Sequence, residues 1–299
     1  MNILASIRPL IHRITPPIIV DAFLRMRAYF QPTFRSKIEW EYIPEGWAYA
    51  ETHPEVKGWN VTDVLETYKE KWPRFVEMVQ GSKPLGLAHE SNLTTNEDII
   101  AHNVMMAFAY ALTTATKYKD QFSMLDWGGG IGHYYLLAQA LLPGVEIEYH
   151  CKDVPVFCVY GSQLFPQQYF HTDEDCFDLV YDFVVVSASM HYTKDWKMLL
   201  QCLAKATSGY LYIASIPIVK QAPSFVFVQR PYQYGYNTEY LAWCLNQTEF
   251  LRIAEKSGLR LLREFIYGHQ PFIQGAPEQN TYRGYLFDIH PEEEHAPEN

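Results

Sequence analysis

Cysteine is scarce in this sequence, and its spacing is irregular. The 299 residues include five cysteines, with no CxxC pair, at Cys151, Cys158, Cys176, Cys202 and Cys244. Disulfide frameworks and zinc knuckles need paired cysteines at short, regular spacings. The pattern therefore argues against both and predicts a reducing compartment, of which the cytoplasm is the simplest.

Long apolar runs and an excess of positive charge are also missing. No apolar stretch reaches the roughly 18 to 20 residues of a membrane span, and Met1–His12 lacks the apolar core and cleavage site of a signal peptide. Lys and Arg number 24 against 34 Asp and Glu, which gives a net charge of −10. Because phosphate contacts need clustered basic residues, this balance argues against nucleic-acid binding.

Apolar and aromatic residues are plentiful. They make up 48% and 15% of the chain, a composition that excludes disorder. The length exceeds the about 100 to 150 residues of a common single domain. We predict four parts, which are a basic amphipathic segment at 1–37, a helical cap at 38–119, an α/β domain at 120–290 and an acidic tail at 291–299.

The N-terminal segment is basic, because Asp21 is the only acid among its first 37 residues. After Pro16 and Pro17, apolar residues recur at helical spacing at Ile19, Ala22, Phe23, Met26 and Phe30. A basic amphipathic helix can lie in a membrane surface. It can equally pack on its own domain or on a second subunit, and the sequence leaves these alternatives and the oligomeric state open.

The next segment, 38–119, shows helical patterns and no alternating strand pattern. We predict helices over Val61–Trp72, from Pro73 to Gly81, and from Thr95 or Asn96 to Leu112. His89 and Glu90 resemble a metal-binding or acid/base pair, but no HExxH continuation follows them. A polar loop before the third helix is therefore the favoured explanation for them.

The most informative stretch is Met124–Tyr135, MLDWGGGIGHYY. A short buried strand over 122–125 is closed by Asp126, and a glycine turn leads into a helix over 134–142. Glycine permits positive φ angles and leaves backbone N–H groups open to a ligand at the helix N-terminus. The spacing fits neither the phosphate loop GxxxxGK[ST] nor the dinucleotide fingerprint GxGxxG.

The spacing that fits is DxGxGxG, which closely resembles the first motif of the class I (seven-strand) S-adenosylmethionine-dependent methyltransferases. The resemblance implies an α/β, Rossmann-like sheet of seven strands, the last one antiparallel, with an N-terminal helical extension. It also implies S-adenosylmethionine as the cofactor. The cofactor-binding residues implied by the motif are Asp126, Gly128, Gly129, Gly130 and Gly132.

In that family an acid at the end of the second strand binds the ribose hydroxyls. The predicted second strand covers 145–150, so the resemblance assigns this role to Asp153, with Glu148 inside the strand as the alternative. The family often has a carboxylate for the adenine amino group after the third strand, predicted here over 168–171. Three acids follow that strand at 173–175, and a solvated turn is another explanation for them.

A run of β-branched and aromatic residues, Phe183–Ser187, predicts a central parallel strand buried on both faces. Ligands of open α/β sheets bind at the carboxyl ends of such strands. We therefore assign Ser187 to the cofactor site and His191 to catalysis, since an imidazole that titrates near neutral pH can deprotonate an attacking hydroxyl. A residue that caps the following helix is the alternative for His191.

The remaining pattern predicts helices over 156–164, 196–206 and 249–257, and strands over 210–216, 259–266 and 282–289. Two terminal strands without an intervening helix are the antiparallel signature of the class I sheet. An insertion begins at Pro217, and Thr248 is predicted to cap the helix that follows it. The insertion carries polar and aromatic side chains that can hold a sugar or another flat substrate or can cover the core, namely Gln229, Arg230, Tyr232, Tyr234, Tyr236 and Tyr240.

Four stretches, GWNVTDVL, LDWGGGIG, VVVSASMHY and VFVQRPY, resemble a methyltransferase family associated with bacterial surface-polysaccharide gene clusters. This resemblance implies a small-molecule or glycan acceptor and O- or N-methylation. That family is expected to have an Arg where this chain has the run from Ala214 to Pro217, which leaves the acceptor open. A non-catalytic scaffold and a dinucleotide oxidoreductase are the competing classes; the intact Asp126 and glycine turn argue against the first, and the failed GxGxxG spacing against the second.

Overall fold

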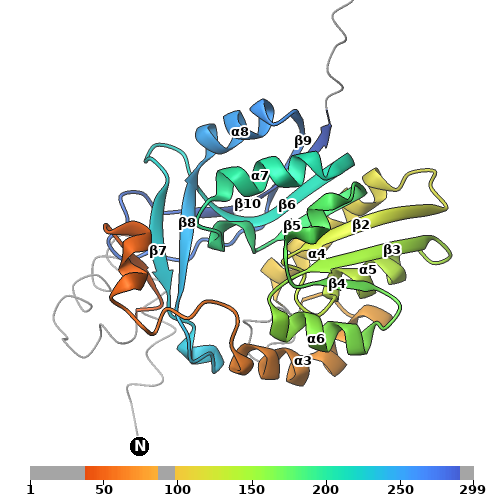
Figure 1. The fold of residues 1–299 in the computed structure, drawn as a ribbon, viewed down its shortest axis with the longest axis horizontal. Helices are drawn as coiled ribbons and strands as arrows, with labels where there is room; N and C mark the ends of the chain where they lie inside the picture. Colours follow the sequence, from red (N-terminus) through yellow and green to blue (C-terminus); the bar gives the residue numbers. More distant parts are fainter. Residues whose placement is uncertain (1–37, 87–97, 290–299) are drawn as a thin grey trace, which may run out of the picture. The chain divides into compact units, whose positions relative to one another are not determined.

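The computed structural model describes residues 38–86 and 98–289 (Figure 1). The chain divides into two units, Met1–Glu39 and Trp40–Asn299, and the elements below belong to the second. The predictions for the amphipathic helix, the acidic tail, His89, Glu90 and the helix start at Thr95 or Asn96 lie outside the described residues.

Seven strands form the predicted sheet, in the order β4-β3-β2-β5-β6-β10-β9. Neighbours from β4 to β6 pair in parallel, whereas β10 runs antiparallel to both β6 and β9. The Rossmann-like sheet with an antiparallel last strand is therefore confirmed. Its strands are β2 (Gln121–Trp127), β3 (Glu146–Lys152), β4 (Tyr169–His171), β5 (Tyr181–Ser187), β6 (Thr207–Val219), β9 (Leu259–Ile266) and β10 (Thr281–Ile289).

Helices cover both faces of this sheet (Figure 1). The alternation of β5 shows the arrangement, because Val184 and Val186 pack with α7 and α8 while Phe183 and Val185 pack with α4 and α5. Burial on both faces explains the uninterrupted apolar run in this strand. The helices that flank the sheet are α4 (Ile99–Ala115), α5 (His133–Leu141), α6 (Pro155–Leu164), α7 (Trp196–Lys205) and α8 (Gln247–Lys256).

Side chains that accept hydrogen bonds from the first turn fix the starts of two of these helices. Asp98 accepts from the backbone N–H groups of Ile100 and Ala101, at 2.9 and 3.0 Å, and begins α4. Asn246 accepts from Glu249 N at 3.0 Å and begins α8. The predicted cap at Thr248 is therefore wrong, because the helix starts two residues earlier than predicted, at Gln247, and takes its cap from the end of the preceding strand.

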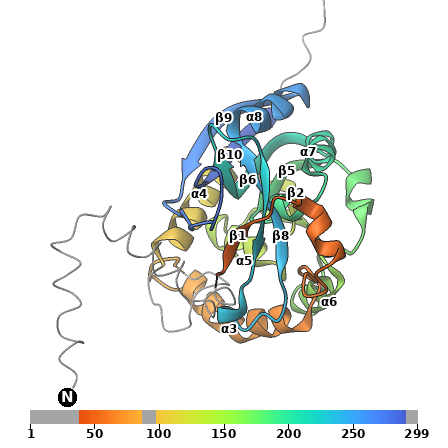
Figure 2. The same cartoon turned by 90° about the vertical axis from the view of Figure 1, so that its left-hand side faces the viewer.

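Three strands that the sequence did not predict extend the sheet beyond β6 (Figure 2). They are β1 (Trp40–Tyr42), β7 (Phe225–Gln229) and β8 (Tyr240–Asn246). The expectation of no strand within 38–119 is wrong, because a three-residue strand is too short to show a period of two and pairs with β7, far along the chain.

The expectation that the fifth strand of the predicted sheet ends before Pro217 is also wrong, because β6 continues to Val219. The parallel pairing with β5 ends at Ala214, and the pairing with β8 begins only at Ile218. Proline lacks a backbone N–H and interrupts a sheet where that group is needed. Pro217 lies between the two pairings and is tolerated there.

The helical segment before the sheet contains one long helix, α3 (Thr62–Gln80), where two were predicted. Pro73 lies inside it, and buried side chains on both sides, including Tyr68 and Phe75, continue one packed face. Short 3-10 helices complete the described chain, namely η2 (Gly46–Glu51), η3 (Glu174–Asp178), η4 (Met190–Tyr192) and η5 (Tyr232–Tyr234). No helix within residues 38–86 and 98–289 is long and apolar enough to cross a membrane.

Candidate active site

The glycine turn, Gly128–Gly132, joins β2 to α5 in a conformation that only glycine adopts easily. Gly128 and Gly130 have φ angles of +75° and +62°. A Cβ on Gly128 would overlap the side chain of Ser189, and one on Gly130 would lie 3.2 Å from Cε2 of Tyr68 in α3. The turn is thus enclosed between the segment after β5 and the helix before the sheet.

The carboxyl group of Asp126 lies directly under this turn. It is fully buried, and a Cβ on Gly129 would overlap it. Tyr149 donates a hydrogen bond to Oδ2 at 2.8 Å, whereas Oδ1 accepts none from the described residues. Burial raises the pKa of Asp126 to about 7; the Tyr149 bond opposes this rise and the charge of Asp153 adds to it.

Asp153 follows the last residue of β3 and reaches the same turn. Its Oδ2 accepts from Gly130 N at 2.7 Å, and its Oδ1 accepts from Val154 N at 2.6 Å. Burial raises the pKa of Asp153 to about 6, although both backbone hydrogen bonds and Lys152 oppose the rise. The structure therefore brings Asp153 together with Asp126 and the glycine turn.

The other acids considered from the sequence have different surroundings. Glu148 is half exposed and lies 3.3 Å from Nε2 of His150. Glu174 pairs with Lys152 at 3.0 Å, and Asp175 contacts Nδ1 of His171 at 2.7 Å. Asp173 accepts from the backbone of Asp175 and caps η3. None of these four side chains contacts the glycine turn in the interactions that the described residues make.

The carboxyl end of β5 adds a second strained segment beside the turn. Ser187 lies 2.7 Å from the hydroxyl of Tyr134 in the first turn of α5. The next residue, Ala188, has a φ of 52°, and Ser215 in the neighbouring strand β6 has a φ of 53°. Positive φ at residues other than glycine is strained and clusters at functional sites. The strain lies where ligands bind to open α/β sheets.

His191 lies in η4, four residues beyond β5, and is fully buried. Its ring is 4.1 Å from that of Tyr192 and meets the ring of Tyr282 edge-on at 6.1 Å. Neither ring nitrogen hydrogen-bonds to a described residue. Burial lowers the pKa of His191 to about 3. The expected titration near neutral pH is therefore wrong, because the sequence did not reveal how deeply this side chain is buried.

An aromatic cluster of Trp59, Tyr192 and Tyr240 adjoins η4. Trp59 stacks on Tyr240 with ring centres 4.2 Å apart and meets Tyr192 at 5.1 Å. Tyr192 also donates to the buried Gln229 at 3.0 Å. This cluster joins the segment before α3 to the predicted insertion.

Other residues of the insertion that were considered as substrate contacts bind mainly to the protein itself. Tyr236 is fully buried in the cluster that includes α3. Arg230 pairs with Glu41 at 2.8 Å and with Glu239 at 3.2 Å, which ties β1, β7 and β8 together. Tyr232 also donates to Glu239, at 2.7 Å. These contacts support the core-covering alternative for Tyr236 and occupy Arg230 with protein carboxylates.

A sequence model of a family described as a methyltransferase domain matches residues 96–264, which is more than half of the chain. The chain belongs to this family. No significant match was found among curated proteins. Within the described part of the methyltransferase, no group of three or more His, Cys, Asp or Glu side chains could hold a metal ion.

Several solved methyltransferases are similar to the chain at low sequence identity. The 1,6-didemethyltoxoflavin N1-methyltransferase of Burkholderia thailandensis is 11% identical with a TM-score of 0.43, covering 63% of this chain and 79% of its own. An S-adenosylmethionine-dependent methyltransferase from Clostridium acetobutylicum is 11% identical with a TM-score of 0.43, and the match covers 63% of this chain and 92% of that protein. Human N-acetylserotonin methyltransferase is 15% identical with a TM-score of 0.42, and the match covers 77% of this chain and 70% of that protein.

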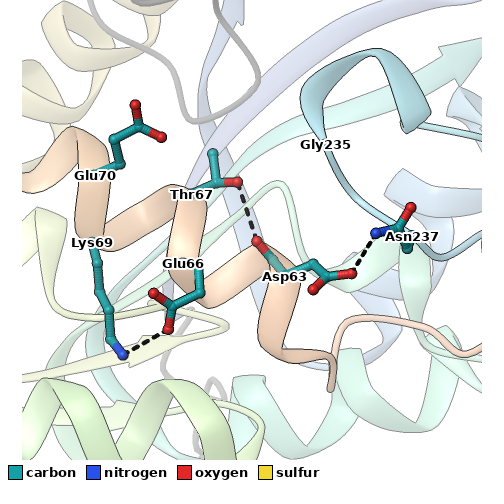
Figure 3. Close-up of a pocket in the computed structure, with 7 residues that line it drawn as sticks. All are labelled: Asp63, Glu66, Thr67, Lys69, Glu70, Gly235 and Asn237. Atoms are coloured by element: carbon teal, nitrogen blue, oxygen red, sulfur yellow. Dashed lines mark hydrogen bonds and ion pairs between the residues drawn. The ribbon is translucent and has the colours of Figure 1, made fainter.

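A surface groove of about 590 Å³ lies between α3 and the segment after η5 (Figure 3). Its polar side chains largely satisfy one another. Asn237 donates to Asp63 at 2.7 Å, and Lys69 pairs with Glu66 at 2.9 Å. The groove therefore ties the insertion to α3 and belongs to the packing around the site.

Three tyrosines of the site were not predicted as functional, namely Tyr68, Tyr134 and Tyr149. Strand alternation indicates that Tyr149 lies near Asp126. Asp126 pairs with Cys151 in the parallel register, and Tyr149, two residues before Cys151, points to the same face of the sheet. The signal becomes readable only once that register is known. Tyr68 was predicted on the buried face of its helix, and only the fold shows that this face meets Gly130.

Proposed function

We propose that this methyltransferase binds S-adenosylmethionine on the glycine turn and transfers its methyl group to a hydroxyl or amine of a small molecule or glycan. The observation that carries the proposal is the meeting of one glycine turn with two buried carboxyl groups, Asp126 beneath it and Asp153 beside it. Both the DxGxGxG spacing and the membership of the methyltransferase-domain family support it.

The residues of the turn fit such a cofactor. The positive φ angles of Gly128 and Gly130 permit the tight turn from β2 into α5. Oδ1 of Asp126 is a buried acceptor without a partner among the described residues. Asp153 would hold the ribose hydroxyls, because an ionised carboxylate has about four acceptor sites and backbone N–H groups fill two of them. Ser187 would complete the cofactor site from β5.

When bound, the cofactor supplies a methyl group that is already activated for transfer. The protein then contributes mainly position and orientation, since an acceptor held in line with the methyl group reacts without diffusing to it. We propose His191 as the residue that takes the proton from a hydroxyl acceptor. Its low pKa keeps the imidazole neutral at pH 7, so that one ring nitrogen can accept a hydrogen bond from the acceptor hydroxyl, while the burial that lowers the pKa also makes the ring a weaker base.

The acceptor would enter beside η4, near the aromatic cluster of Trp59, Tyr192 and Tyr240. Aromatic rings present flat apolar surfaces with polar edges and suit sugars and planar molecules. A surface-polysaccharide glycan is the acceptor that the sequence resemblance favours. Contact with a membrane surface through segment 1–37 remains a separate proposal, outside the described residues.

Calorimetry on the full chain tests this function. Titrations with S-adenosylmethionine, S-adenosylhomocysteine and NAD are run in parallel on wild type and on Gly130→Val. We expect wild type to bind the first two ligands and not NAD, and the variant to bind none. Binding of NAD alone would assign the turn to an oxidoreductase, and absence of all binding would favour the non-catalytic alternative.

A further inference from the structure

Tyr149 stands out among the buried polar groups because it contacts the Asp126 carboxyl from the neighbouring strand. In the parallel register of β2 and β3, Tyr149 pairs with Met124 and Cys151 pairs with Asp126. Since side chains alternate along a strand, Tyr149 and Asp126 lie diagonally on the same face of the sheet. Their hydrogen bond, 2.8 Å long, crosses that diagonal.

The phenol of Tyr149 is itself held in place. It is fully buried, and its ring stacks on Tyr135 of α5 with centres 4.7 Å apart and an angle of 27°. Phe170 of β4 meets the same ring at 6.3 Å. Packing on two elements fixes the position of the hydroxyl, so that Asp126 is oriented by Tyr149.

The two oxygens of Asp126 are used differently. Oδ2 accepts from Tyr149, while the buried Oδ1 accepts from no described residue. An unpaired buried acceptor is unfavourable, and a ligand that donates to it would remove that cost. A Cβ added to Gly129 would lie 2.5 Å from Oδ2 and 2.9 Å from Oδ1, so both oxygens lie close to the turn. The free oxygen therefore belongs to the floor of the glycine turn.

We propose that Tyr149 is a positioning residue that holds the Asp126 carboxylate by Oδ2 and so keeps Oδ1 available to the ammonium group of the cofactor. The proposal rests on the proposed function, since it concerns the same cofactor site. Tyr149 touches neither the glycine turn nor, by our assignment, the cofactor. Its effect passes through Asp126.

The pH at which Asp126 ionises distinguishes a positioning role for Tyr149 from a purely structural one, because a purely structural tyrosine would not change it. The Tyr149 bond lowers the pKa of Asp126 against the burial that raises it to about 7. The other titratable groups that face this pair are Asp153, Cys151, Tyr134 and Tyr135. Removing the Tyr149 hydroxyl leaves burial and Asp153 unopposed, so that Asp126 takes up a proton at a higher pH.

The experiment measures the affinity of the full chain for S-adenosylhomocysteine by calorimetry at intervals from pH 5.5 to 7.5. This ligand carries the ammonium group without the sulfonium, and the range lies below the pKa of about 8 of an α-amino group. For Tyr149→Phe we expect the fall in affinity on the acid side to move to higher pH, with a loss of about tenfold at pH 7. The matched control is Tyr135→Phe, whose hydroxyl bonds to Gln139 at 3.0 Å and not to Asp126.

A second variant keeps the test decisive if Tyr149→Phe does not fold. Asp126→Asn still accepts from Tyr149 but cannot ionise, so its affinity should be lower and constant across this pH range. The positioning role would be overturned if the pH midpoint of the fall in affinity were unchanged in Tyr149→Phe, or if Asp126→Asn still lost affinity on the acid side. Binding by wild type would uphold the proposed function in either case. Failure of wild type to bind S-adenosylhomocysteine at any pH would overturn both.

Discussion

Asp153 accepts a hydrogen bond from the backbone N–H of Gly130 at 2.7 Å, so the acid after β3 and the turn after β2 form one unit. The same carboxyl group also accepts from Val154, at the start of α6. It thereby joins two strand-to-helix connections that lie side by side at the carboxyl edge of the sheet. A residue in this place shapes the glycine turn in addition to any contact it makes with a ligand.

Removing the Asp153 carboxyl should weaken cofactor binding. For Asp153→Ala we expect a loss of about 1.5–3 kcal/mol, since a charge-assisted pair of hydrogen bonds to the ribose would be absent. Calorimetry with S-adenosylhomocysteine measures this loss. Glu148→Ala is the control, because Glu148 is half exposed and pairs with His150. Normal binding by Asp153→Ala together with weak binding by Glu148→Ala would reverse the assignment.

Bulk at Gly130 should abolish cofactor binding. A valine there would adopt a strained positive φ and would press its side chain toward Tyr68, into the space that the ligand needs. The control is Gly144→Val, in the turn after α5, where φ is +89° but no atom lies within 4 Å of the added Cβ. Both variants carry backbone strain, so crowding around Gly130, beside Tyr68, is what separates them. Equal affinity in the two variants would remove the turn from the site.

Asp126→Asn should be more stable than wild type above neutral pH. The folded-state pKa of Asp126, about 7, exceeds the ordinary value of 3.8. The contribution of this group to the free energy of unfolding is therefore fully present below pH 3.8 and is lost as pH rises through 7. At 1.36 kcal/mol per pKa unit, the ionised buried group costs at most about 4 kcal/mol at pH 8. Urea unfolding at pH 8 and pH 4 should show a gain for the variant at the higher pH only. A gain of the same size at both values would attribute it to packing.

His191→Ala should lower turnover with little change in cofactor affinity. If His191 takes the proton from a hydroxyl acceptor, we expect a loss of roughly a hundredfold or more. Because burial lowers its pKa to about 3, the wild-type rate should show no acid limb near pH 6.5 from this residue. The pH–rate profiles of both proteins provide the measurement once an acceptor is known. Cofactor binding that falls in proportion to turnover would make His191 structural, and full turnover would exclude it from the reaction.

The parts of the fold that follow from local pattern were predictable from the sequence. The strands around Phe183 and Met124 are buried on both faces and read as continuous apolar runs. The glycine turn carries its own spacing, and the distance along the chain from that turn led to Asp153, which contacts Gly130 in the structure. In these cases the residues that determine the structure are close in sequence.

The remaining features depend on contacts between distant segments. Trp40 begins a strand only because Gln229 is its partner, and the burial of His191 comes from packing against elements such as Tyr282 in β10. Pro217 was interpreted as the end of a strand. The sequence does not show that the pairings with β5 and β8 both leave this position without a hydrogen bond to donate. The Tyr149–Asp126 bond likewise requires the register of two strands.

The pairing of β1 with β7 also constrains when the molecule can complete its fold during synthesis. Trp40–Tyr42 emerge from the ribosome long before their partners at Phe227–Gln229 and before Gln274, which bonds to both Trp40 and Tyr42. Contacts of such sequence separation form slowly, because a long loop must close before they are made. The segment from Trp40 to Trp59 therefore exposes its aromatic side chains until nearly the whole domain has been made. Nascent chains arrested before Phe225 would be the form of this protein most prone to aggregate and most dependent on chaperones.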